Sequence, residues 1–422
     1  MVTQTTPIVQ QPQASTYNHP REDLLDGRRR EYLDFGVPLY RASMEGDLEA
    51  AKGILQGGEY LVRCSITEKK DTPLHVAAAR QSTKFVRYLV DVMNKDDLEL
   101  QNQDGNTAFC IAAISGNVDM VEIMLEKNQA LTTIRGSKNM MPIYLVAFHG
   151  NKDMVTKLYN MSNKLTGWTN DEIDEVLLMC IKSDIFDVAL RILEDNEELP
   201  QDKHAWDVLH VLGRKPDAFH DGPYRHPGPV DKFLASLGLG TKTNIKEADA
   251  RPLLRFLWKR IVGKPKDVID GILRGPMIVK DKMETYPSQI LFIAAKMNNR
   301  GFLVELIGEY PDLVLMRNDD GQTIFHIAVS HRHRKVFSLL DSTGSMKHLI
   351  TSVRDQQGNN ILHLVGKNPE KNAYGNSVTT PFQLFSEHFW YEVHLLCFQS
   401  FHRLLSCLYL LKANTISPDK LV

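Results

Sequence analysis

Histidine is the residue type whose number and spacing in this sequence could support chemistry. The chain has 15 histidines, and a neutral imidazole can bind a metal ion or act as a general base. Four histidines share one position of a repeated pattern: His75, His210, His326 and His363. Other copies carry at this position Tyr40, Cys110, Tyr144 and Phe292. A shared metal ligand or base would not be replaced by phenylalanine, so we predict a structural role for this position and no metal site.

Other sequence patterns for catalysis are also missing. Gly238-Leu239-Gly240 lacks the third glycine of a dinucleotide-binding loop, and Gly263-Lys264 lacks a preceding glycine-rich loop. The sequence has no nucleophile elbow, kinase catalytic loop, zincin helix or Asp-His-His-Cys acyltransferase core. Its five cysteines form no Cys-x-x-Cys pair, which fits a reducing compartment. We therefore expect a protein that is not an enzyme, without catalytic residues, cofactor, metal or small-molecule substrate.

Composition and charge indicate a globular chain that does not bind nucleic acid. Of its 422 residues 43% are apolar and 24% charged, enough for a substantial core, and the formal net charge is −2. Phosphate binding needs a basic surplus, which this chain lacks. Polar and charged residues interrupt the most apolar stretch, 389–411, and each charge would cost about 2–3 kcal/mol in a bilayer. We expect no membrane span there, no secretory signal, and a disordered segment over 1–36.

A sequence period of 33 to 35 residues determines the expected fold. Copies begin at positions 38, 73, 108 and 142, continue more weakly at 175 and 208, and return at 290, 324 and 361. Thr72 and Thr107 are suited to cap a helix, and Pro73 suits its first position. Residues able to adopt a left-handed conformation follow eight positions after the start, where the helix would end: Gly46, Gly116, Gly150 and Asn298. Each copy therefore predicts a turn and two short antiparallel helices.

The second helix of each copy also has an identifiable buried side. Apolar residues recur thirteen positions after the start: Ala51, Val86, Val121, Val155 and Val188. A single copy cannot bury such a face alone, so neighbouring copies must stack into a solenoid. We see no β-branched strand runs between the helices, which argues against a doubly wound α/β enzyme. The predicted fold class is all-α.

These residues resemble the ankyrin repeat. The motif from Thr72 to Ala78 reads Thr-Pro-Leu-His-Val-Ala-Ala and matches the signature of that family, and the other copies are degenerate. The resemblance covers about residues 37–213 and 286–370. It implies an ankyrin-repeat α-solenoid and a histidine ring that hydrogen-bonds backbone near the turn.

The two-block arrangement is similar to plant ankyrin proteins with a C-terminal PGG membrane domain, of the accelerated-cell-death and salt-tolerance type. The run Leu209–Pro216 and the run Asn359–Leu364 carry this resemblance. It implies a role in plant defence, cell-death control or salt-stress signalling, with membrane anchoring and the repeats in the cytoplasm. After about Lys371 no Pro-Gly-Gly motif follows, so we expect this chain to lack that domain. The tail 372–422 is an alternative transcript end, a gene-model artefact or a docking helix.

The sequence divides into five predicted segments. A disordered segment over 1–36 precedes the first ankyrin block at 37–213, and a second block spans 287–371 before the hydrophobic tail 372–422. Between the blocks, residues 214–286 form a Pro-rich insert with a basic amphipathic helix: Leu254, Arg255, Leu257, Trp258, Lys259, Arg260 and Ile261. This helix either packs its apolar stripe on a flanking ankyrin block or contacts anionic lipid or a calmodulin-like partner.

The stack should present its turns and first helices on a concave side that binds proteins. Candidate helix residues are Val76, Ala79, Arg80, Ile111, Ile114, Ser115, Leu145, Phe148 and His149. Candidate turn residues are Lys69, Lys70, Gln103, Asp104, Ser137 and Lys138. Ile111 and Leu145 could instead pack between repeats, whereas Phe148 is the expected aromatic anchor.

The preferred function is therefore a cytoplasmic ankyrin scaffold that binds other proteins, in plant stress or defence signalling. The alternative is a regulator of a channel or receptor complex at the membrane surface, on the cytoplasmic face of the plasma membrane. It would be held there through residues 251–262 or the tail. A nuclear transcription-cofactor role lacks a long Lys/Arg cluster and stays open.

Overall fold

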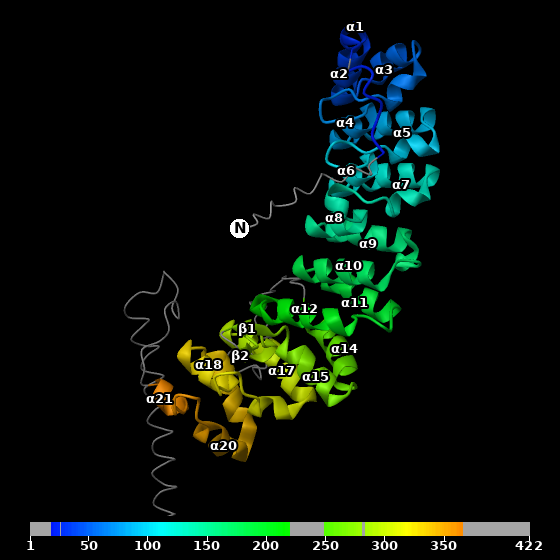
Figure 1. The fold of residues 1–422 in the computed structure, drawn as a ribbon. Helices are drawn as coiled ribbons and strands as arrows, with labels where there is room; N and C mark the ends of the chain where they lie inside the picture. Colours follow the sequence, from blue (N-terminus) through cyan, green and yellow to red (C-terminus); the bar gives the residue numbers. More distant parts are fainter. Residues whose placement is uncertain (1–17, 26, 220–248, 281–282, 366–422) are drawn as a thin grey trace, which may run out of the picture. The chain divides into compact units, whose positions relative to one another are not determined.

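The computed structural model describes residues 18–25, 27–219, 249–280 and 283–365. The chain splits into two compact units, Met1–Val188 and Ala189–Val422. The described residues are mostly helical, with one short hairpin in the second unit (Figure 1). The predicted all-α repeat class is confirmed. The predicted tail 372–422 lies outside the described residues.

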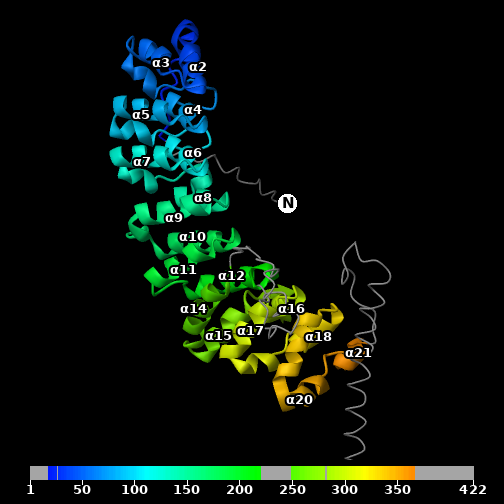
Figure 2. The same cartoon turned by 180° about the vertical axis from the view of Figure 1, so that it is seen from behind.

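The first unit is a stack of helix pairs. Figure 2 shows α2, α4, α6 and α8 in one column and α3, α5, α7 and α9 in a second. The α-helices of this unit, with α11 crossing its end, are α1 Arg29–Glu31, α2 Val37–Glu45, α3 Leu48–Leu55, α4 Pro73–Ala79, α5 Thr83–Val92, α6 Ala108–Ile114, α7 Val118–Lys127, α8 Pro142–Phe148, α9 Lys152–Met161, α10 Asn170–Lys182 and α11 Phe186–Asp195. Short 3-10 or π turns lie between them: η1 Tyr32–Gly36, η2 Glu59–Arg63, η3 Lys95–Glu99, η4 Gln129–Thr132, η5 Ser137–Asn139 and η6 Asn163–Leu165. Each first helix packs on the next, α2 on α4, α4 on α6, α6 on α8 and α8 on α10.

The start of α4 shows why the repeat needs threonine and histidine at these positions. The Thr72 hydroxyl accepts the His75 amide at 3.4 Å, and His75 Nδ1 accepts the Thr72 amide at 3.2 Å. Because Nδ1 is an acceptor, the ring proton is on Nε2, which donates to the Asn106 carbonyl at 3.0 Å. His75 thus caps its own helix and bonds to the turn of the next repeat. Thr107 caps α6 in the same way, accepting the Cys110 amide at 3.2 Å.

The same arrangement returns in the second unit. His326 Nδ1 accepts the Thr323 amide at 3.2 Å, and Nε2 donates to the Val353 carbonyl at 3.2 Å. The structural role predicted for the histidine position is confirmed at His75 and His326. Within the residues that the structure describes, His363 makes the local part of this arrangement, its Nδ1 accepting the Asn360 amide at 3.3 Å.

His210 does not share this role. The weak copy predicted to start at Val208 belongs to α12 (Asp202–Gly213), which begins six residues earlier. His210 therefore lies in the last turn of the helix, where it cannot cap the first, and its ring stacks on Trp206 with centroids 4.5 Å apart. The predicted start at Val208 is therefore wrong for this helix.

The helix ends follow the prediction closely. Gly46, Gly116, Gly150 and Asn298 all have positive φ, between 58° and 78°. The carbonyl crowding that a Cβ meets in this conformation costs about 1–2 kcal/mol for a non-glycine residue, which explains why glycine recurs at this position. Gln81 accepts the same conformation, with φ of 57°.

The segment before the first repeat is folded where the structure describes it. We expected disorder over 1–36, but Leu24 is only 1% exposed. The Arg21 amide donates to the Arg63 carbonyl at 3.0 Å, and the Gln101 amide donates to the Asn18 carbonyl at 2.8 Å. Residues 18–25 therefore lie along the turns of the first repeats.

The second unit continues the paired-helix pattern in the part of the predicted insert that the structure describes, at 249–280. Its elements are α12, η7 Pro216–Ala218, α14 Arg251–Val262, α15 Lys266–Arg274, β1 Ile278–Lys280, β2 Met283–Thr285, α16 Ile290–Lys296, α17 Arg300–Glu309, η8 Pro311–Leu315, α18 Ile324–Ser330, α19 Arg334–Phe337, η9 Ser338–Met346, α20 Lys347–Ser352 and α21 Ile361–Val365. First helices pack in the order α12, α16, α18 and α21. Helix α14 packs on α17, so it takes the position of a second helix after α12. The segment predicted as a linker thus supplies part of a repeat.

A two-stranded antiparallel hairpin precedes α16. Ile278 is paired with Thr285, Val279 with Glu284, and Lys280 with Met283.

Among the helices of the described ranges, none is both long and apolar enough to cross a bilayer.

We predict that His75→Ala lowers the free energy of unfolding by about 1–3 kcal/mol at pH 7.5, because the Asn106 carbonyl loses its buried donor. Burial lowers the pKa of His75. The unfolded chain then binds protons more readily, so the histidine contributes its full stability above about pH 6.5 and loses it as pH falls. Urea unfolding of both proteins at pH 7.5 and 5.0 measures this. The difference in the free energy of unfolding between wild type and His75→Ala should shrink at pH 5.0. The control His348→Ala, at an exposed histidine, should unfold like wild type at both pH values. A difference that grows in acid contradicts the assignment.

Candidate protein-binding surface

The first helices of the Met1–Val188 unit carry the predicted contact residues, and these differ widely in exposure. Val76 and Leu145 are buried, at 6% and 5%. Ile111, Ile114 and Ser115 are half-buried, whereas Ala79, Arg80 and His149 are exposed. For Leu145 the packing alternative is therefore the one that the structure shows. Val76 likewise belongs to the core, whereas Ile111 at the same repeat position is only half-buried.

Phe148 is exposed to 60%, unlike the other large apolar members of this set, Val76, Ile111, Ile114 and Leu145. It is the last residue of α8, immediately before the turn at His149 and Gly150. Its ring meets the His149 ring edge-on, with centroids 5.5 Å apart. A large aromatic side chain with this exposure can contribute much apolar area to a contact without loss of core packing.

The turn residues are held by hydrogen bonds between adjacent repeats. The Gln103 amide donates to the Lys69 carbonyl at 2.8 Å, and the Ser137 amide donates to Asn106 Oδ1 at 2.8 Å. Lys70 forms an ion pair with Glu22 at 2.6 Å. Gln103, Asp104 and Lys138 have exposed side chains. The backbone of these turns is fixed, and their side chains form a polar rim.

Two helix residues of the set make internal bonds. Arg80 Nε donates to the Met44 carbonyl at 3.2 Å, and the Ser115 hydroxyl donates to the Ala112 carbonyl at 2.8 Å. They fix neighbouring repeats or their own helix, so their polar groups are less available to a partner than those of the turns.

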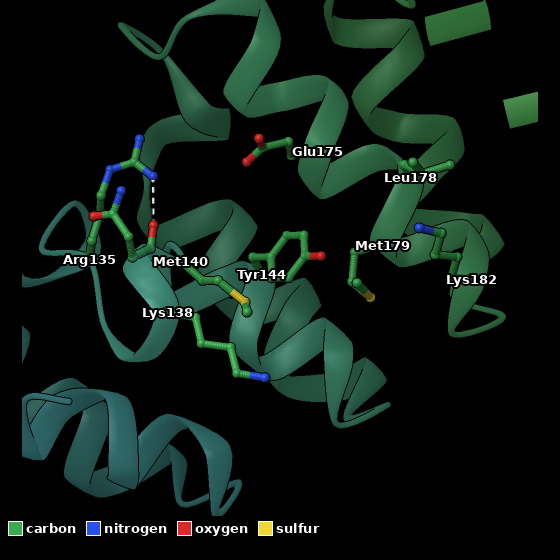
Figure 3. Close-up of a pocket in the computed structure, with 9 residues that line it drawn as sticks. Arg135, Lys138, Met140, Tyr144, Glu175, Leu178, Met179 and Lys182 are labelled. Atoms are coloured by element: carbon green, nitrogen blue, oxygen red, sulfur yellow. Dashed lines mark hydrogen bonds between the residues drawn. The ribbon is translucent and has the colours of Figure 1, made fainter. Parts of the chain in front are cut away.

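A pocket of about 350 Å³ opens beside this surface, between the turn before α8 and helix α10 (Figure 3). Its lining residues are Arg135, Lys138, Asn139, Met140, Tyr144, Glu175, Leu178, Met179 and Lys182. Of these only Lys138 was predicted. Tyr144 stands two positions after the repeat start at 142, as His75 does after 73, and Lys182 stands seven positions after the repeat start at 175, as Arg80 does after 73. The repeat period could therefore have identified both residues.

Arg135 joins the two walls of the pocket. Its guanidinium donates to the Asn139 carbonyl at 2.9 Å and forms an ion pair with Glu172, while Gln101 Nε2 donates to the Arg135 carbonyl at 2.8 Å. Glu172 also accepts the Thr169 amide at 2.9 Å, which completes the capping box of α10. The Thr169 amide and the Arg135 charge hold the pKa of Glu172 below its ordinary value.

Tyr144 and Glu175 contribute a phenol and a carboxylate to the pocket. Partial burial, and secondly the Glu175 carboxylate, raise the pKa of Tyr144 above its ordinary value. The phenol therefore stays protonated near neutral pH and can donate a hydrogen bond. Within the described ranges, no cluster of three or more His, Cys, Asp or Glu side chains is placed to hold a metal ion.

The predicted amphipathic helix is real, but its apolar stripe is core. Leu254, Leu257, Trp258 and Ile261 are at most 1% exposed, and the Trp258 indole donates to the Leu306 carbonyl at 3.0 Å. These side chains cannot reach lipid or a partner unless the unit opens. The structure therefore corrects the lipid or partner-helix alternative in favour of packing on neighbouring repeats.

The basic residues of α14 are also largely engaged within the unit. Arg255 forms a two-pronged ion pair with Glu305 at 2.6 and 2.7 Å. Arg260 donates to the carbonyls of Asn196 and Leu199, and Lys259 is exposed. Arg255 and Arg260 thus fix the helix in place.

Comparison with protein families agrees with this architecture. Residues 39–135 match the family model described as ankyrin repeats in three copies. The chain contains ankyrin repeats. The match covers α2 through α7 and the turn that leads to α8. It includes the Thr72–His75 cap, and the same helix pairing continues beyond it.

Three curated plant proteins are similar to part of the chain. E3 ubiquitin-protein ligase KEG of Arabidopsis thaliana is 24% identical over 167 residues, 37% of this chain and 10% of that protein. Probable E3 ubiquitin-protein ligases XBOS31 and XBOS32 of Oryza sativa subsp. japonica are 22% and 27% identical, over 31% and 28% of this chain. The matches span 28% of XBOS31 and 23% of XBOS32. In each case the similarity spans less than a third of the relative's length.

We predict that two substitutions in α8 differ strongly in their effect on the free energy of unfolding. Leu145→Ala should cost about 2–5 kcal/mol, because it removes buried apolar volume. Phe148→Ala should change stability by less than about 0.5 kcal/mol, because its ring is mostly in water. Thermal melting of both variants followed by circular dichroism gives the comparison. A large drop for Phe148→Ala would place its ring in the core.

Helix α14 gives a separate prediction. Trp258→Ala should destabilise the Ala189–Val422 unit by about 3–5 kcal/mol, through lost burial and an unpaired Leu306 carbonyl. Lys259→Ala on the exposed side is the matched control and should have little effect. Urea unfolding measures both, and a stable Trp258→Ala variant would contradict the burial of this helix.

Proposed function

We propose that this chain is a non-enzymatic scaffold that binds other proteins on the first-helix and turn side of its Met1–Val188 unit. The exposure of Phe148 carries the proposal. Its ring lies on a fixed helix end beside polar turns, and interfaces typically combine an aromatic anchor with such a polar rim. Ankyrin repeats are an interaction fold, and the distribution of core and exposed residues fits that use.

We place this binding in plant stress or defence signalling, within the cytoplasm. Support comes from the resemblance to plant ankyrin proteins with a PGG domain, and from similarity to plant proteins named as ubiquitin ligases. Because these matches cover only a part of each ligase, we extend to this chain the binding of proteins and not the ligase activity. Membrane attachment through α14 finds no support in its buried stripe, and the tail 372–422 lies outside the described residues.

Proximity labelling in plant cells tests the proposal. Wild type, Phe148→Ala and the control Leu349→Ala would each be fused to the same labelling enzyme. Leu349 is 57% exposed and lies in the other unit. We predict that labelling of the specific partners falls about tenfold or more for Phe148→Ala, as expected of a hot-spot residue, and stays unchanged for Leu349→Ala. Equal labelling of one partner set by all three proteins would contradict the proposed surface.

A further inference from the structure

The hairpin of β1 and β2 in the Ala189–Val422 unit exposes a run of apolar residues (Figure 1). Met277, Ile278 and Val279 follow one another along the chain and are exposed to 48%, 50% and 63%. Because successive side chains of a strand point to opposite faces, both faces of β1 are apolar here. Single exposed apolar residues are common, but a continuous exposed patch marks an interaction site more often.

The register of the hairpin determines which backbone groups face outward. In an antiparallel ladder, residues bonded to the partner strand alternate with residues whose backbone groups point away from it. Two residues separate Lys280 from Met283, the pair at the turn, and the pair that closes a two-residue turn is a bonded one. The next pair, Val279 and Glu284, therefore turns its amide and carbonyl groups toward the two outer edges.

The edge of β2 is already covered, whereas the edge of β1 is open. Tyr286 lies two residues after Glu284, and its outward amide donates to Asp319 Oδ2 at 2.5 Å. The other oxygen of Asp319 accepts Gln289 Nε2 at 3.0 Å. On the β1 edge, none of the residues that the structure describes bonds to the outward backbone groups of Val279. An unpaired edge of this kind is a template for another strand.

A pocket of about 620 Å³ lies where β1 begins. Most of its exposed lining is apolar, from helices α12 and α15 and the segment before β1: Trp206, Val268, Gly271, Ile272, Gly275 and Pro276. Its three charged members each have a contact within the chain. Asp202 pairs with Lys264 at 2.5 Å, Asp207 lies 3.7 Å from His204 Nδ1, and Lys203 interacts with another group of the chain. The pocket therefore suits an apolar side chain.

Trp206 and Gly275 make this end of the strand rigid. The Trp206 indole donates to the Ser288 carbonyl at 3.2 Å and stacks on the His210 ring. Gly275 has φ of 72°, and a Cβ at this position would lie 2.1 Å from Trp206 Nε1. The chain can pass so close to the indole only because this residue is glycine. A preformed pocket wall and strand lower the ordering cost of binding.

The exposed strand is too small to be an interface between two copies of the chain. Complete burial of three such side chains removes no more than about 350 Å² from water. A stable interface buries about 800 Å² on each partner. A short extended segment needs less area, because main-chain hydrogen bonds to the strand edge supply part of its affinity.

We propose that the β1 edge binds an extended apolar segment of a partner protein as an added strand, with one large apolar side chain of that segment in the pocket beside Trp206. Backbone bonds to Val279 supply affinity, and the pocket supplies specificity. At about 3.3 Å per residue, a segment of about five residues reaches from Val279 to Gly275. The site lies in the other unit from Phe148, so it is a second contact beyond the proposed function.

Two substitutions test the edge and the pocket separately. Val279→Pro removes the outward amide hydrogen and keeps the bonds within the hairpin, because proline is tolerated on an edge strand. Its control, Val279→Thr, retains the amide. Gly271→Leu fills the pocket from α15, where an added Cβ meets no atom within 4 Å. Its matched control is Gly308→Leu, at an exposed glycine of α17 with equally open surroundings.

Peptide selection on the full chain provides the experiment. A phage-displayed library of random twelve-residue peptides would be depleted on Val279→Pro and then selected on wild type. We expect peptides with alternating apolar residues, whose affinity falls about tenfold or more for Val279→Pro and Gly271→Leu, as for one lost buried contact. Both controls should bind like wild type. N-methylation of alternate peptide residues should weaken binding, and circular dichroism melting confirms that each variant is folded.

The remaining outcomes contradict the strand site. Failure to enrich peptides that depend on Val279→Pro overturns it. Peptides that lose affinity for Gly271→Leu but tolerate N-methylation at every position also overturn it, because they use the pocket without adding a strand. A wild-type dimer in analytical ultracentrifugation that Val279→Pro dissociates would make a second copy the occupant. Phe148→Ala should bind the peptides like wild type, so a negative result here leaves the proposed scaffold function standing.

Discussion

The structure depends on each repeat burying small residues against its neighbours. Four alanines of the first helices are completely buried, each 0% exposed: Ala77, Ala78, Ala112 and Ala113. Larger side chains at these positions would hold the helices apart. The close approach that alanine permits brings the turn of one repeat within hydrogen-bond range of the next. The His75 bond to the Asn106 carbonyl spans this distance. Backbone groups in the turns are thus satisfied between repeats, and the turns become rigid.

Rigid turns explain how a protein made of short helices can present a defined surface. Helices of seven residues such as α4, α6 and α8 are too short to be stable alone. Their order comes from neighbours, as in other repeat arrays, where stability is a sum of units and interfaces. Side chains on the exposed edge contribute little to that sum. Phe148 and Lys138 therefore lie where the sequence can vary without loss of the fold.

The repeat period predicted most of the fold because burial and capping act at fixed positions. Threonine caps and glycine ends are local requirements, and both were identified from the residues alone. The period failed where a helix was extended at its start, as in α12, whose first turns carry no proline or threonine cap. It also failed across 214–286, because sequence spacing cannot show that α14 takes the place of a second helix. Contacts between distant segments decide that point.

The candidate surface was predictable to a lesser extent, for a related reason. The repeat position distinguishes helix faces, so it gave Phe148 as a candidate contact residue, and the structure shows its ring exposed. It could not rank burial between Val76, Ile111 and Leu145. The pocket at Tyr144 depends on the extended α10 and on the left-handed turn at Lys138, features in which this repeat departs from its neighbours. The left-handed turn at Lys138 adds backbone strain to this repeat. In a repeat array, the copy that departs from the shared pattern is therefore the place to look for a specific contact, because the pattern itself accounts for packing.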